Sequence, residues 1–359
     1  MGDEAPDNVL QRVRENNHVE RINKRKAMYD KQRNIDGKPT GTKIDKLTEE
    51  EFINAARTIC SGPSDLKEKS LSILKTGFIV DKAWMISFMK VEGALHALVK
   101  CLMSHNPVEQ LLAAECCCNL SLGDTRTCFK LAKAATPYLI SILQGLNHNL
   151  MNVCLLTVFN LCGSGEKSCE LLHSQGILNV LEKTMSIIEV RENSMKALTT
   201  LTKNGSSYIT EAEVIKLVHS ILPHFESVRV QWLVYLLSSL PYVIPILLQE
   251  DLPRRILLIL DLVSYVSHLN ITSVTALVRL LGNMSADQEG ITACTMIAKW
   301  AITCRIFKFF STTSYRHLGK EMYWIIGNLM HHRNPKVHKD LQHVNVRELG
   351  CQIANPFPQ

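Results

Sequence analysis

Six short stretches of this chain repeat one pattern at nearly constant spacing. In each, small and apolar residues lead to a polar residue that is followed by Leu or Met. The polar residues are Asn119, Asn160, Thr200, Ser239, Asn283 and Asn328. They lie 41, 40, 39, 44 and 45 residues apart, with only helical apolar patterns between them. One such period cannot bury its own apolar faces, so successive units must stack to create a core.

A period of this length with helices alone is typical of armadillo or HEAT repeats. We therefore predict an all-α fold, a right-handed superhelical armadillo-repeat solenoid of about seven repeats with a long concave groove. The solenoid is expected over residues 46–345, after a basic helical tail and linker at 1–45 and before a C-terminal tail at 346–359.

Apolar faces at helical spacing give the expected helices. The N-terminal repeat covers 47–79, and the later units pair 95–99 with 108–120, 134–143 with 150–162, 176–185 with 190–202, 214–225 with 228–240, 252–266 with 271–284, and 296–310 with 318–330.

Cysteine and histidine usage excludes several classes of site. The twelve cysteines include the run Cys116, Cys117 and Cys118, but they form no CxxC pair and follow no secretory signal. We read them as reduced, mostly buried thiols in a protein of the cytoplasm and nucleus. The histidines form no HExxH motif, and the cluster His331, His332, His338 and His343 is expected in a solvated loop. We expect no metal and no cofactor.

Neither an enzyme nor a membrane protein is expected. No paired carboxylates, nucleophile with a base, or phosphate loop occurs at usable spacing, so no catalytic residue is proposed. The uncharged run Trp232–Leu248 is interrupted by Pro241 and Pro245 and is shorter than the roughly 20 residues that a membrane span needs. Proteins, rather than nucleic acid or a membrane, are the expected partners.

The tail at 1–45 differs sharply from the rest of the chain. Between Gln11 and Ile35 basic residues outnumber acidic ones and apolar residues are few, so the tail cannot form a core element. Good helix formers over 18–33 end at Gly37, Pro39 and Gly41. We expect a basic helix that docks onto an acidic partner surface; a solvated charged tail is the alternative, and nucleic acid or an anionic membrane is less favoured.

Several stretches resemble importin α. LLAAECCCNLSLG and TALVRLLGNMS resemble third-helix motifs of its repeats, and GKEMYWIIGNLM is the closest match. RKAMYDKQRNI, at 25–35, resembles an importin β binding segment. Residues 65–240 are similar to the transmembrane and coiled-coil domain-containing protein 6 family, through VEGALHALVKCLM, AATPYLISIL and HSQGILNVL. The chain is identified as an importin-α-like member closest to that family.

This resemblance implies a nuclear import adaptor that binds importin β and an extended, possibly basic, cargo segment. In the family, Asn amides bond the backbone of the extended peptide, and Trp faces receive the stems of Lys and Arg. The implied peptide-binding residues are Asn119, Asn160, Arg279, Asn283, Trp324 and Asn328. The implied importin-β-binding residues are Arg21, Lys24, Arg25, Lys26, Lys31 and Arg33.

The chain departs from the family motif at the Trp position. Successive repeats carry Glu115, Leu156, Lys196, Tyr235, Arg279 and Trp324 there. Lys196 places a positive charge where a basic ligand would lie, which opposes binding of conventional basic signals. The alternative is therefore an armadillo scaffold whose groove serves a non-basic protein partner, which could be associated with a membrane.

Overall fold

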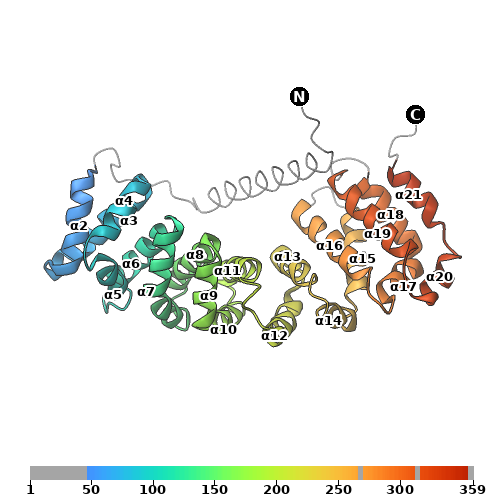
Figure 1. Ribbon diagram of the computed structural model, residues 1–359, viewed down its shortest axis with the longest axis horizontal. Coiled ribbons are helices and arrows are strands. Elements are labelled where there is room, and N and C mark those ends of the chain that lie inside the picture. Colours follow the sequence, from blue (N-terminus) through green and yellow to red (C-terminus); the bar gives the residue numbers. More distant parts are fainter. Residues whose placement is uncertain (1–46, 266–269, 312–315, 355–359) are drawn as a thin grey trace, which may run out of the picture. The chain divides into compact units, whose positions relative to one another are not determined.

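The computed structural model describes residues 47–265, 270–311 and 316–354 (Figure 1). These residues form α-helices and short 3₁₀ turns, with no strand among them. They form two compact units, unit 1 up to residue 208 and unit 2 from residue 209 onward. The basic tail, including the six residues predicted to bind importin β, lies outside the described residues.

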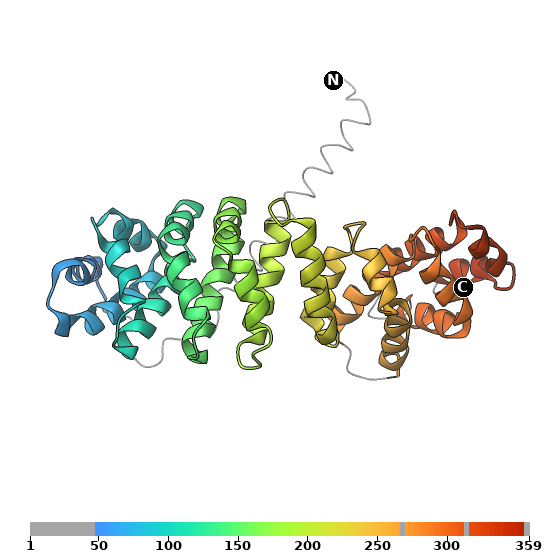
Figure 2. The same ribbon diagram turned by 90° about the horizontal axis from the view of Figure 1, so that it is seen from below.

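Unit 1 is a row of helical repeats, seen side by side in Figure 2. Its helices are α2 (Glu49–Ser61), η2 (Ser64–Leu66), α3 (Lys67–Val80), α4 (Lys82–Lys90), α5 (Ala94–Cys101), α6 (Pro107–Leu120), α7 (Thr125–Leu143), α8 (His148–Ser164), α9 (Glu166–Ser174), α10 (Ile177–Thr184) and α11 (Arg191–Asn204). The last helix of each repeat is called its third helix. These are α3, α6, α8 and α11, and each packs against the next.

Unit 2 repeats the arrangement. Its helices are α12 (Glu211–Ile221), η3 (Leu222–His224), α13 (Val228–Leu237), α14 (Ile244–Gln249), α15 (Leu252–Val263), α16 (Ile271–Met284), α17 (Ile291–Ala298), α18 (Trp300–Ser311), η4 (Arg316–Leu318), α19 (Gly319–Met330), α20 (Pro335–Leu341) and α21 (Val346–Ala354). The third helices α13, α16 and α19 pack in sequence. The predicted all-α, armadillo-like solenoid fold is confirmed.

Local sequence signals explain where the third helices begin. Asn106, Asn147 and Asn270 each accept a hydrogen bond from a backbone N–H in the first turn of α6, α8 and α16. An Asn at this position satisfies one of the N–H groups that a helix start leaves unpaired. The same residue type therefore opens the third helix in three of the repeats.

Within a repeat, the short first helix (α4, α9 or α14) is joined to the second (α5, α10 or α15) through a residue in the left-handed backbone conformation. Gly93 and Gly176 have φ of 75° and 86° just before α5 and α10. Glycine takes this conformation without a side-chain clash. Asp251 occupies the equivalent place before α15 with φ of 51°, and Asp is among the few other residues that tolerate it.

The structure corrects three details of the sequence prediction. Short first helices, such as α4, α9 and α14, were not expected. α7 runs without a break through Pro137, where a new helix was expected to start at 134. The expected C-terminal tail begins with α21, which packs on α18 and α19 and buries Val346 and Leu349.

The histidine cluster was also predicted incompletely. His332 is buried, its Nε2 lies 2.8 Å from the carbonyl oxygen of Asp287, and its Nδ1 accepts from the Asn334 N–H at 3.1 Å. His338 lies in α20. The expectation of a solvated loop is therefore wrong for these two residues. Within the described ranges no group of side chains is arranged to hold a metal, and no helix has the length and apolar character to span a membrane.

Candidate functional site

Two rows of side chains run along the third helices of each unit. The first row holds the residues that lie four positions before the polar residue of each repeat, where the importin α motif has Trp. The amide row holds the polar residues themselves. In unit 1 the rows are Glu115, Leu156, Lys196 and Asn119, Asn160, Thr200; in unit 2 they are Tyr235, Arg279, Trp324 and Ser239, Asn283, Asn328.

All four asparagines of the amide row make a side-chain hydrogen bond from their own repeat to the preceding one. Their Nδ2 groups donate to the Lys75 carbonyl oxygen (Asn119, 2.9 Å) and to the hydroxyls of Ser121 (Asn160, 3.0 Å), Ser238 (Asn283, 2.7 Å) and Ser285 (Asn328, 2.9 Å). Two of these serines stand two residues after an Asn, in Asn119-Leu-Ser121 and Asn283-Met-Ser285. This Asn-x-Ser spacing is the sequence signal for the hydrogen bonds between repeats. We did not predict these bonds, because the same asparagines resemble a peptide-binding motif.

The two hydroxyl residues in the amide row do not make this bond. Thr200 Oγ1 donates to the Lys196 carbonyl oxygen at 3.0 Å, and Ser239 Oγ donates to that of Leu236 at 2.8 Å. The Thr200 bond stays within α11, and the Ser239 bond joins the turn after α13 to the end of that helix. On α11 the connection is made one turn later, where Asn204 Nδ2 donates to the Cys162 carbonyl oxygen at 3.0 Å.

Burial separates Asn160 from the other three amides. Asn160 is 2% exposed, and its Oδ1 has no hydrogen-bond partner. Asn119, Asn283 and Asn328 are partly exposed. A primary amide carries two N–H donors and an acceptor oxygen. Each of these three asparagines uses Nδ2 to bond the preceding repeat, and its second Nδ2 hydrogen and its Oδ1 can still bond a ligand. The burial of Asn160 favours a structural role for that residue.

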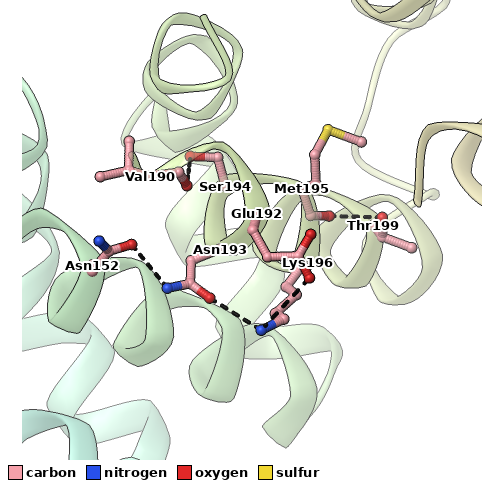
Figure 3. A network of polar contacts seen from close by, with 8 residues as sticks. All are labelled: Asn152, Val190, Glu192, Asn193, Ser194, Met195, Lys196 and Thr199. Atoms are coloured by element: carbon pink, nitrogen blue, oxygen red, sulfur yellow. Dashed lines mark hydrogen bonds and ion pairs between the residues drawn. The ribbon is translucent and has the colours of Figure 1, made fainter. Parts of the chain in front are cut away.

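In unit 1 the charged residues of the first row are held by neighbouring side chains. Glu115 Oε2 pairs with Lys75 Nζ at 2.7 Å. Lys196 belongs to a polar network between α8 and α11 (Figure 3). Its Nζ donates to Asn193 Oδ1 at 3.2 Å, and Asn193 Nδ2 donates to Asn152 Oδ1 at 2.9 Å.

In unit 2 the first row forms a linked set on three helices. Arg279 Nε donates to Glu321 Oε1 of α19 at 2.9 Å, and the Arg279 guanidinium carbon lies 5.8 Å from the ring centroid of Tyr235 on α13. Trp324 is 47% exposed. Its ring rests on Gly282 of α16, where an added Cβ would lie 3.0 Å from Cζ3. Glu321, the acidic residue of the GKEMYWIIGNLM stretch, thus orients Arg279 from a position 42 residues away, a pairing that the sequence did not predict.

The cysteine run lies in the core of unit 1. Cys116 and Cys117 are fully buried, and burial raises the pKa of Cys118 to about 12. A thiol with so high a pKa stays protonated and unreactive at neutral pH. The cysteines of the described ranges are free, as predicted, and most are buried.

No known protein-family profile matches the chain. Among solved structures, an engineered protein superposes with a TM-score of 0.68 at 14% identity, over 83% of this chain and 72% of that one. A designed armadillo repeat protein matches with a TM-score of 0.43 at 15% identity over 83% and 98%. Another, in complex with a (KR)4 peptide, matches with a TM-score of 0.44 at 14% identity over 84% and 99%. The stacked helical repeats described above make the chain an armadillo-like helical-repeat protein in fold.

Proposed function

We propose that the third-helix face of unit 2 binds an extended segment of a partner protein, so that the chain acts as a peptide-binding adaptor. The observation that carries this proposal is the exposed ring of Trp324 beside the partly exposed amides of Asn283 and Asn328. Tryptophan and arginine dominate the binding energy of many protein interfaces, and Arg279 completes the set.

The geometry suits an extended main chain. Backbone N–H and C=O groups of an extended peptide need partners along its length. The Oδ1 atoms of Asn283 and Asn328 can accept from such N–H groups, and their remaining Nδ2 hydrogens can donate to C=O groups. Side chains that alternate along the peptide would then reach the ring of Trp324.

We propose further that this adaptor serves nuclear import and works in the cytoplasm and nucleus. Support comes from the resemblance of residues 25–35 to an importin β binding segment, with Arg21, Lys24, Arg25, Lys26, Lys31 and Arg33 as the contacts. The test is binding of importin β to the full chain and to a chain lacking residues 1–45. Loss of binding with the tail is expected; equal binding by both forms, or by neither, would rule out this role for the tail.

A scaffold for a non-basic partner is the second candidate. It is favoured by Lys196, which is held in the first row by Asn193, and by the Arg279–Glu321 pair, which occupies a position where the family motif receives a basic ligand. Both candidates share the binding face of unit 2. They differ in what binds the tail and in the charge of the bound segment.

The binding face itself is tested by screening the full chain against an array of random-sequence decapeptides. Peptides that bind are measured again with Trp324→Ala, and a loss of roughly tenfold or more is expected for an interface hot spot. Tyr265→Ala is the matched control, because Tyr265 is an aromatic residue that is 68% exposed and follows α15 rather than lying on a third helix. Binding that resists Trp324→Ala but is lost in Tyr265→Ala would place the site elsewhere.

A further inference from the structure

The charges on the third helices of unit 2 are unbalanced. α16 carries Arg279, and α19 carries Lys320 and Glu321, so these two helices hold two cations and one carboxylate. Glu321 is already paired with Arg279 at 2.9 Å. Asp287, the first acidic residue after α16, is buried and accepts from the backbone N–H groups of Ile291 and Thr292. These helices therefore offer no unpaired carboxylate to a basic ligand.

Arg279 is held in position by both neighbouring helices. Glu321 binds its Nε from α19, and the Tyr235 ring supports the guanidinium from α13. The Arg279 side chain remains 34% exposed. Because guanidinium has N–H donors on its two Nη atoms as well, it can bind a second carboxylate while Glu321 stays bound. Such prior orientation lowers the entropic cost of recognising an anion.

We infer that the segment bound by unit 2 is acidic, with a carboxylate on Arg279, an apolar side chain against Trp324, and its main chain on Asn283 and Asn328. This inference rests on the proposed function of the same face. A basic segment would meet Arg279 and Lys320 where Glu321, the one carboxylate of these helices, is already paired, and like charges of this kind act against the wrong partner.

The experiment uses the full chain and fluorescein-labelled decapeptides that share one apolar sequence and carry Glu, Gln or Lys at the same positions. Fluorescence polarisation is expected to rank the Glu peptide above the Gln peptide by about tenfold, as charge-assisted hydrogen bonds imply. The Lys peptide should bind most weakly. Affinity for the Glu peptide should fall as salt is added.

Variants separate the Arg279 site from the basic tail, which can itself attract acidic peptides. Arg279→Gln should abolish the difference between the Glu and Gln peptides, and Arg279→Glu should reverse the preference toward Lys. Lys196→Gln is the matched control, since it removes one cation from the same row in unit 1, and it should change nothing. Thermal melts of each variant confirm folding.

Tighter binding of the Lys peptide, with sensitivity to Trp324→Ala, would overturn the acidic ligand and leave the proposed function standing. A Glu preference that survives Arg279→Gln would also overturn it, because the tail would then be responsible. Failure of all three peptides, alone and at high concentration, would count against the binding face itself and so against both proposals.

Discussion

Units 1 and 2 use the same positions of the repeat for different purposes. In unit 1 the amide row contains the buried Asn160, and the charged first-row residues are held by Lys75 and Asn193. In unit 2 the first row exposes Trp324, and the amides beside it are partly accessible. A repeat motif therefore reports the register of the helices, whereas exposure decides whether a motif residue can meet a ligand.

The largest effect is expected from a matched pair of tryptophans. Trp84 in unit 1 is 9% exposed and its ring lies 5.3 Å from that of Phe52. Trp84→Ala should lower the free energy of unfolding by about 3–5 kcal/mol. Trp324→Ala should lower it less, by about 2 kcal/mol, because nearly half of that residue is already in water. Urea unfolding followed by circular dichroism measures both, and equal losses would erase the contrast between the units.

A pair of amide substitutions sharpens the comparison next. Asn160→Asp places a carboxylate where the side chain is 2% exposed, which should destabilise the protein by about 3 kcal/mol at neutral pH. Asn328 is partly exposed, so water screens the new charge in Asn328→Asp, which should cost about 1 kcal/mol. A smaller loss for Asn160→Asp than for Asn328→Asp in the same unfolding experiment would contradict the burial argument.

Two glycines of unit 2 give a smaller effect. In Gly282→Ala the new Cβ would lie 3.0 Å from Trp324 Cζ3, so the ring must move. In Gly327→Ala the Cβ would meet nothing within 4 Å, and this helix-interior change should stabilise α19 by up to about 1 kcal/mol. Ligand binding should weaken in Gly282→Ala alone. Unchanged binding there would mean that the position of the Trp324 ring does not matter.

The smallest effect is expected at Lys196. Its Nζ lies 3.9 Å from Glu192, whose side chain is 61% exposed. Lys196→Gln should therefore change the free energy of unfolding by less than about 0.5 kcal/mol. Thermal unfolding provides the measurement, and a loss of several kcal/mol would show that the network in Figure 3 supports unit 1 far more than its exposure suggests.

The sequence predicted the third helices well because their apolar faces and polar marks recur at one period. It missed α4, α9 and α14 because helices of six to nine residues have too few turns to establish a periodic face. Pro137 was compatible with a break between two helices, yet α7 continues through it, because the helix packs against its neighbours on both sides of the proline. Tertiary contacts override local preference at such places.

At the candidate site, the sequence predicted the register of the helices. Spacing placed Asn283, Trp324 and Asn328 in register, and the structure brings their helices together. It could not distinguish the buried Asn160 from the exposed amides, because all occupy the same position of the motif. Nor could it find the Arg279–Glu321 pair, because residues 42 apart meet only after the repeats stack.

The hydrogen bonds that the asparagine side chains make between repeats also affect how easily each unit bends. Water competes for a hydrogen bond only where it can reach it. The boundary between α6 and α8, closed by the buried Asn160, should therefore resist bending, while the boundary between α16 and α19, closed by the accessible Asn328, should yield more easily. A peptide held by both Asn283 and Asn328 would bridge that softer boundary, so its binding would fix the curvature of unit 2.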